Sequence, residues 1–175
     1  MTNYLPRLAT ANDIQGIFNL YSIVSKETGG LARTSDEITY DYVSSFTSKA
    51  FDNGLQFIIE NQLDQSIIGE IHCYKLELKV FDHILSELTI AVHPDFQSQG
   101  FRKLLFQSLF KQVMDVKRDI LRIELIARES NKKAIAFYQK LGFQIEGRLL
   151  NRIKTESGFE ADIPMAWMND NYQPV

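Results

Sequence analysis

Four polar residues, Gln97 to Gly100, stand between an apolar strand pattern and an apolar helix pattern. Residues 88–92 alternate as a half-buried strand does, and Pro94 ends the run because proline has no N–H for a strand ladder. Apolar residues then recur at helical spacing over residues 101–113. A glycine-bearing turn between a strand and a helix points backbone N–H groups at an anion, and the helix dipole adds to the attraction. The pattern predicts a phosphate-binding turn.

The elements that must position this turn follow from hydrophobic periodicity and turn signals. Helices are expected to start at residues 10–13, 34–37, 101 and 130–131, and a polar loop is expected at residues 151–160. The predicted strands are 4–8, 56–60, 67–78, 85–92, 119–126, 143–149 and 161–168. A helix between strands 85–92 and 119–126 makes that pair parallel within a mixed sheet. The sequence therefore predicts an α/β (α+β) fold of about seven strands and four helices, in one domain over residues 1–175.

Composition excludes several classes of protein. Of the 175 residues, 45% are hydrophobic and 23% charged, which is ordinary for a globular domain. The net charge of −3 argues against a nucleic-acid surface and allows a cationic substrate. No stretch reaches the roughly 20 apolar residues of a membrane span, and the N-terminus lacks a leader pattern.

Cysteine and histidine are too sparse for a disulfide framework or a metal cluster. The single cysteine, Cys73, suits a reducing cytoplasm, and its strand position favours core packing over a nucleophilic role. The three histidines, His72, His83 and His93, are scattered, so no metal is expected.

Two stretches narrow the fold further. Residues 92–102, Val-His-Pro-Asp-Phe-Gln-Ser-Gln-Gly-Phe-Arg, resemble motif A of the GNAT superfamily of acyl-CoA N-acetyltransferases, with the core Gln/Arg-x-x-Gly-x-Gly/Ala. Residues 131–143, Asn-Lys-Lys-Ala-Ile-Ala-Phe-Tyr-Gln-Lys-Leu-Gly-Phe, resemble motif B, Asn-x-x-Ala-x-x-Phe-Tyr-x-x-x-Gly-Phe. The resemblance covers nearly the whole chain and is loosest over residues 21–53, on the acceptor side. It implies a mostly antiparallel sheet with a splayed parallel pair, flanked by helices, and a homodimer is common among relatives.

The resemblance also implies where acetyl-CoA, the acetyl donor, binds. The backbone of Ile90, Ala91 and Val92 would pair with the pantetheine arm, and the Val92 N–H would face the oxyanion. Tyr138 would protonate the leaving thiolate, although its helix position also fits a core aromatic. Asn131 would contact the cofactor, cap its helix, or do both. The pyrophosphate would lie on the amides of Gln97, Ser98, Gln99, Gly100, Phe101 and Arg102.

The general base is the least defined part of this site. Acetyl transfer needs a neutral amine, so a base must remove a proton from an ammonium with a pKa of about 10. In the branch that acetylates ribosomal-protein N-termini, a glutamate stands where this chain has Ile126. Glu124, on the same strand face, and Glu87, on the strand leading into the turn, are the candidates. Glu70 and His72 are more remote, and each of these side chains also fits a paired structural charge.

Arg102 departs from the family pattern, which has Gly or Ala at this position. A small residue lets the backbone approach the pyrophosphate closely. Either the guanidinium turns outward and binds a CoA phosphate, or its bulk weakens cofactor binding; the affinity of guanidinium for phosphate favours the first alternative.

Three functions remain open at this point. The leading one is an N-acetyltransferase that moves the acetyl group of acetyl-CoA to a primary amine, by direct attack in a ternary complex. The amine would belong to a small molecule or a protein N-terminus, and the acidic pI and the Gly29-Gly30 loop favour a small molecule. A non-catalytic acyl-CoA sensor and a different nucleotide-binding protein are the alternatives. The acidic residues Asp36, Glu37 and Asp41 form either a solvated helix face or a rim for a cationic acceptor.

Overall fold

The computed structural model describes residues 4–27 and 31–174. The helices are α1 (Ile14–Val24), α2 (Tyr40–Asn53), α3 (Phe101–Asp115) and α4 (Lys132–Lys140). The strands are β1 (Arg7–Leu8), β2 (Gly54–Glu60), β3 (Ile67–Tyr74), β4 (Ile84–Val92), β5 (Arg122–Arg128), β6 (Gln144–Ile145), β7 (Leu149–Thr155) and β8 (Gly158–Met168). The helices and strands follow one another in the predicted order, apart from one additional strand near the C-terminus. The predicted mixed α/β fold is therefore confirmed.

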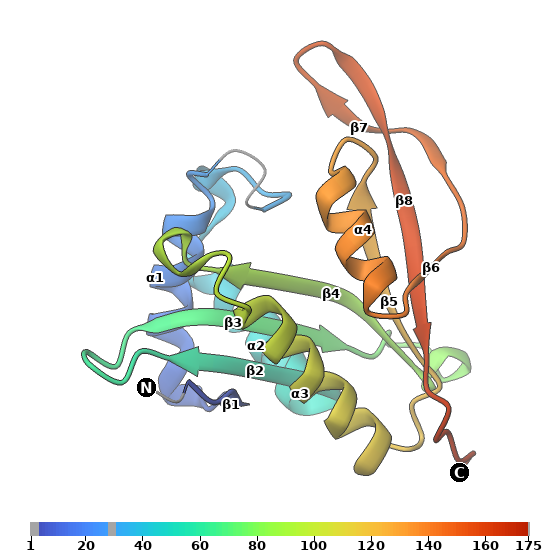
Figure 1. Ribbon diagram of the computed structural model, residues 1–175, viewed down its shortest axis with the longest axis horizontal. Helices are drawn as coiled ribbons and strands as arrows, with labels where there is room; N and C mark the ends of the chain where they lie inside the picture. The colour runs from blue at the N-terminus through green and yellow to red at the C-terminus, as the bar shows by residue number, and fades with distance from the viewer. Residues whose placement is uncertain (1–3, 28–30, 175) are drawn as a thin grey trace.

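The strands form a single mixed sheet that opens in its middle. Their order is β1-β2-β3-β4-β5-β8-β6, with β7 attached to β8. Among the described strands, only β4 and β5 run parallel to each other, as the helix between them predicts. Their pairing is short and consists of Ile84 with Arg122 and Leu85 with Ile123. Beyond Leu85 the two strands separate, and Figure 1 shows β4 running toward α1 while β5 runs beside α4. The divergence creates space in the middle of the sheet.

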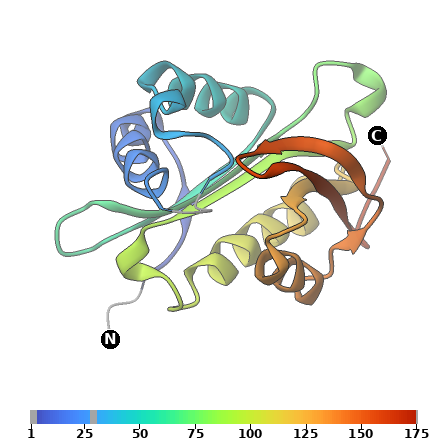
Figure 2. The same ribbon diagram turned by 90° about the horizontal axis from the view of Figure 1, so that it is seen from above.

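The helices cover the sheet from both sides. In Figure 2, α1 and α2 lie on one face, whereas α3 and α4 lie on the other. Alternating strand residues supply the two cores, since successive side chains in a strand point to opposite faces. Val92 and Ile71 pack in the core under α3, whereas Ala91 and Ile58 pack under α1 and α2.

The predicted loop at residues 151–160 is wrong. Strands β7 and β8 instead form a hairpin that turns at residues 156–157, and the strand predicted over residues 143–149 splits into β6 and the start of β7. Residues Leu149 to Arg152 are all exposed, and the hairpin projects from the body of the molecule (Figure 1). A strand with little buried surface carries no apolar alternation, so periodicity did not reveal it.

The second helix begins later than predicted. Thr34 and Glu37 close a capping box, but around a single 3₁₀ turn that ends when Ile38 adopts an extended conformation. Helix α2 then starts at Tyr40, where the Thr39 side chain accepts a hydrogen bond from the Tyr42 N–H. The turn predicted at Thr28-Gly29-Gly30 lies outside the described residues.

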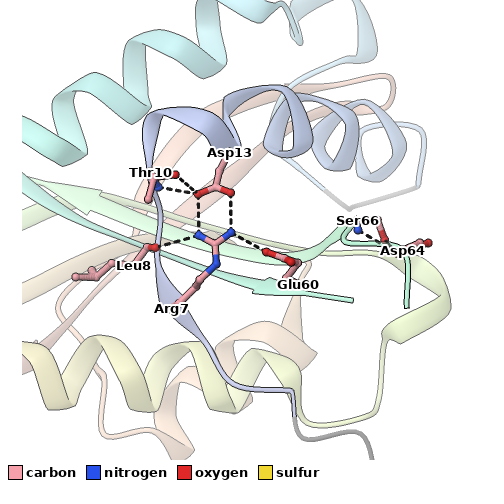
Figure 3. Close-up of polar contacts among 7 residues, drawn as sticks. All are labelled: Arg7, Leu8, Thr10, Asp13, Glu60, Asp64 and Ser66. Carbon is pink, nitrogen blue, oxygen red and sulfur yellow. Dashed lines mark hydrogen bonds and ion pairs between the residues drawn. The ribbon is translucent and has the colours of Figure 1, made fainter. Parts of the chain in front are cut away.

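An ion-pair cluster fixes the N-terminal strand (Figure 3). The Arg7 guanidinium donates to both oxygens of Asp13, at 2.8 Å each, and to Glu60 at 2.7 Å. The backbone N–H of Thr10 donates to the same Asp13 carboxylate at 2.7 Å. The hydrogen bonds from the Arg7 guanidinium have the largest effect on Asp13 and, together with those from Thr10, hold its pKa below the ordinary value.

Replacing Arg7 by Ala is expected to lower the free energy of unfolding by about 1–2 kcal/mol, because it leaves the mostly buried Asp13 carboxylate without its main partner. A depressed carboxyl pKa stabilises the fold above the unfolded-state pKa of about 4, and this contribution disappears as the pH falls through the folded-state pKa. The difference between wild type and variant in urea titrations should therefore be largest above pH 4 and shrink on acidification. Lys111→Ala breaks an exposed pair with Asp115 and serves as the control, with an expected loss of a few tenths of a kcal/mol.

Candidate functional site

A row of cavities follows the opening between β4 and β5. One of about 550 Å³ lies at the predicted phosphate turn, and one of about 530 Å³ lies between the separated strands. Two further cavities measure about 390 Å³ and about 240 Å³. Thr89 lines both of these and also the cavity of about 530 Å³, so the three adjoin one another. The cavity at the turn lies next along the same two elements, because β4 and α4 supply Val92 and Phe137 to it and Ile90 and Tyr138 to the cavity of about 530 Å³. These four cavities are called the groove below.

The predicted turn has the backbone of an anion site. Gly100 precedes α3 with a φ of +88°, and Ser98 has a φ of +63°, so the chain adopts the left-handed conformation twice within three residues. The first N–H groups of an α-helix have no intrahelical partner, and in α3 the N-cap residue Gly100 supplies no side-chain hydrogen bond to them. A Cβ at position 100 would meet no atom within 4 Å, so φ alone favours glycine there.

Cations surround this turn. Arg102, Lys103 and Lys133 line the 550 Å³ cavity together with Gln97, Ser98 and Gly100. The Arg102 side chain is exposed, in agreement with the outward orientation predicted for it, and its binding to a CoA phosphate stays a prediction. Positive charge beside free amides suits a polyphosphate.

Ile90 of β4 lines the 530 Å³ cavity together with Asn131 and Tyr138, which lie at the start of α4 and within it. Asn131 is the N-cap of α4, and its side-chain oxygen accepts a hydrogen bond from the Ala134 N–H at 3.1 Å. The predicted cap is therefore confirmed. A contact between Asn131 and the cofactor stays a prediction.

Tyr138 combines an anchored ring with an unengaged hydroxyl. Its ring packs edge-to-face against Phe106 and Phe143, with centroids 5.8 and 5.9 Å away. Within residues 4–27 and 31–174 we find no hydrogen bond to its hydroxyl. Burial raises the pKa of this hydroxyl, and the charge of Arg102 lowers it in part. The hydroxyl is thus protonated at neutral pH and can donate a proton.

A bulge in β4 presents Glu87 to the groove. Thr89 faces His72 and Ser86 faces Tyr74, so β4 has one residue more than β3 between these pairs. Glu87 lies in the bulge with a φ of +56°, a conformation that costs about 1 kcal/mol for a residue other than glycine. Its exposed side chain lines both the 390 Å³ and the 240 Å³ cavities, and its carboxylate has no ion pair within the described part of the chain.

Glu124 lies in the same groove but is already paired. Arg122 forms an ion pair with Glu124 at 2.9 Å and donates a hydrogen bond to Glu146 at 2.6 Å, and the Ser86 hydroxyl donates to Glu124 at 3.2 Å. Of the two predicted bases, Glu124 therefore fits the alternative of a structural charge, whereas Glu87 is available to a ligand.

A buried polar network behind Thr89 was not predicted as a unit. The carboxylate of Glu70, which is 0% exposed, accepts hydrogen bonds from the Tyr21 hydroxyl at 2.7 Å and from Gln56 at 2.8 Å. His72, 2% exposed, lies 3.0 Å from the same carboxylate and stacks on the Phe46 ring at 4.0 Å. The signal in the sequence was the alternation of Glu70, His72 and Tyr74 within an apolar strand, which places all three on one face.

Three further predictions concern Cys73, metal binding and membrane-spanning helices. Cys73 is buried and free, as core packing predicts, and burial raises the pKa of its thiol. Across the described residues there is no group of three or more His, Cys, Asp or Glu that could hold a metal. No helix in residues 4–27 and 31–174 is long and apolar enough to cross a membrane.

Comparison with known proteins gives one consistent result. The sequence model of the acetyltransferase (GNAT) family matches residues 18–143. The [ribosomal protein bS18]-alanine N-acetyltransferase of Escherichia coli K12 is 38% identical over 86 residues, which are 47% of this chain and 57% of that enzyme. The spermidine N(1)-acetyltransferase of the same strain is 29% identical over 102 residues, or 55% of this chain and 53% of that enzyme. The matched segment thus spans little more than half the length of each relative.

Solved structures match along nearly the whole chain. The crystal structure of a GNAT-family acetyltransferase from Streptococcus pneumoniae superposes with a TM-score of 0.83, covering 95% of this chain and 99% of that one. Its sequence identity is 22%, so the likeness concerns the fold.

Proposed function

Because the chain belongs to the GNAT family of acetyltransferases, we propose that it moves an acetyl group from acetyl-CoA to a primary amine. The single observation that carries this proposal is the groove between β4 and β5. It joins a cation-lined phosphate turn to a cavity lined by Ile90 and Tyr138, and then to the unpaired Glu87. One elongated cofactor and one acceptor fit this order of chemistry along the groove.

The residues divide the work of a direct transfer. The turn at residues 97–102 holds the pyrophosphate, and the freed edge of β4 from Ile90 to Val92 binds the pantetheine arm. The amine nitrogen attacks the thioester carbonyl, and the Val92 N–H donates to the oxygen that becomes negative. As the intermediate collapses, the C=O bond forms again, the C–S bond breaks and Tyr138 gives its proton to the sulfur. The attacking nitrogen releases its extra proton to solvent, and Tyr138 takes up a proton in return. The N–C bond remains in the acetylated product.

Glu87 accepts the proton that the acceptor ammonium must lose, directly or through one water. Glu87→Gln removes this carboxylate without changing its size, and kcat/KM is expected to fall about 100-fold or more. Glu124→Gln is the matched control, because Arg122 already occupies that carboxylate, and its kcat/KM should stay within a few-fold of wild type. Steady-state thiol release measures both, and a larger loss in the Glu124 variant would reverse the assignment.

The test of the function is thiol release from acetyl-CoA across a panel of amines. It should include small molecules and peptides with free N-termini, since relatives acetylate either spermidine or a ribosomal-protein alanine. Amine-dependent release is expected. Tight acetyl-CoA binding without release for any amine would instead favour a non-catalytic acyl-CoA sensor.

A further inference from the structure

We infer that the acceptor is an amino carboxylate, such as an α-amino acid, with Arg33 binding its carboxylate and Glu87 facing its ammonium. This inference rests on the proposed function and specifies its acceptor. It comes from the charges that line the cavity of about 390 Å³, whose wall includes Arg33, Glu37, Tyr42, Glu87 and Thr89.

Arg33 is a cation held in place without a carboxylate partner. Its guanidinium lies over the Tyr42 ring, 4.0 Å from the centroid. In the part of the chain that the structure describes, no carboxylate lies within 4.0 Å of it. Arg122, which also lines the groove, differs because it pairs with Glu124 at 2.9 Å and with Glu146 at 2.6 Å. An exposed guanidinium that packs on an aromatic ring in a cavity wall, with no carboxylate partner among the described residues, suits a ligand carboxylate.

Glu87 supplies the opposite charge in the same cavity. The other glutamate of this wall, Glu37, is engaged by the Thr34 N–H at 2.9 Å and by the Thr34 hydroxyl at 3.1 Å. Glu87 carries no comparable contact within the described ranges, and the bulge holds it toward the cavity at the cost of a left-handed φ.

The hydroxyls of Tyr42 and Tyr74 are influenced by the charges of both Arg33 and Glu87. Burial raises the pKa of Tyr42 and of Tyr74. For each hydroxyl, the positive charge of Arg33 lowers the pKa and the negative charge of Glu87 raises it. These directions agree with the geometry, in which Arg33 lies over the Tyr42 ring and both Arg33 and Glu87 line the cavity of about 390 Å³.

The charge order selects among the possible amines. A polyamine would bring a second ammonium toward Arg33, where like charges repel. A protein N-terminus has no free carboxylate beside its α-amine and would leave Arg33 unmatched. An amino carboxylate pairs both charges. Its nitrogen then lies on the Glu87 side, next to Thr89, which also lines the cofactor cavity.

The test compares matched acceptors in a thiol-release assay with mass spectrometry of the products. The standard L-amino acids are assayed beside their carboxamides and the amines left by decarboxylation. Wild type should prefer the best amino acid over its carboxamide by roughly 10- to 100-fold in kcat/KM, the factor expected for one charge-assisted hydrogen-bond pair. Arg33→Gln should reduce this ratio to near one, and Arg33→Glu should invert it in favour of a diamine.

Arg148→Gln is the control, since it removes a surface arginine paired with Glu129 outside the groove, and it should keep the wild-type ratio. The inference is overturned if wild type uses carboxamides or diamines as well as amino acids, or if Arg33→Gln keeps the preference. Calorimetric binding of the same amino acids to the protein saturated with CoA separates this result from a failure of the proposed function. Arg33-dependent binding without turnover with any amine would support the acceptor class and overturn the acetyltransferase proposal.

Discussion

Replacing Tyr138 by Phe should lower kcat about 100- to 1,000-fold while acetyl-CoA binding stays within a few-fold of wild type. The substitution removes one oxygen from a side chain whose ring packs against Phe106 and Phe143, so the packing of α4 is preserved. The lost atom is the hydroxyl of a residue that lines the 530 Å³ cavity, and burial keeps this hydroxyl protonated. General acid catalysis of this kind contributes about 10²- to 10⁴-fold.

The measurement is the amine-dependent rate of thiol release, together with the Kd of acetyl-CoA from calorimetry. Tyr40→Phe gives the control, because this tyrosine is 47% exposed at the start of α2 and lines none of the four cavities of the groove. A Tyr138→Phe variant with wild-type kcat would show that Tyr138 is a packing residue only. A variant that loses acetyl-CoA binding would show that the hydroxyl holds the cofactor rather than donating a proton.

Replacing Glu70 by Ala should lower the free energy of unfolding by about 3–5 kcal/mol. A fully buried carboxylate is stable only because donors surround it, and here Tyr21 and Gln56 donate at 2.7 and 2.8 Å while His72 lies at 3.0 Å. Alanine would remove the acceptor of their shortest hydrogen bonds and leave only the longer contacts of Tyr21 with His72 at 3.4 Å and of Gln56 with Thr47 at 3.3 Å. A buried group that loses its partner costs about 1–3 kcal/mol. The cavity left by the lost side chain adds to the cost.

Urea unfolding followed by far-UV circular dichroism measures the loss. The control is Glu156→Ala, in the exposed turn of the β7–β8 hairpin, where we expect a change within about 0.5 kcal/mol. A loss below about 1 kcal/mol for Glu70→Ala would mean that the network does not stabilise the fold as its geometry indicates. A variant too unstable to isolate can be replaced by Tyr21→Phe, which deletes a single donor and should cost about 1–3 kcal/mol.

The conformation of the turn at residues 97–100 was predictable because its signals are local. Pro94 ends the strand and Gly100 supplies a left-handed φ, and both effects depend on the residue itself. The cap at Asn131 is local in the same way, since its side chain reaches an N–H three residues ahead. The parallel pairing of β4 and β5 followed from the helix between them, which leaves few other arrangements.

The acceptor side depends on contacts between distant segments, which no periodicity encodes. Arg33 meets Tyr42 across the break before α2, and Tyr21 reaches Glu70 from another element of the fold. The bulge that presents Glu87 comes from a mismatch between two strands, so neither strand reveals it alone. The sequence therefore identified Glu87 and Glu124 as candidates, and only the ion pair with Arg122 separates their roles.

Acetyl transfer itself is tested most directly by mixing the protein with acetyl-CoA and an amine panel and following thiol release and acetylated product together. We expect one class of amine to raise thiol release well above the rate without acceptor. One acetylated amine should form for each CoA released, and Tyr138→Phe should abolish most of the amine-dependent rate. Release that does not depend on any amine, or an amine that is consumed without acetylation, would contradict this expectation.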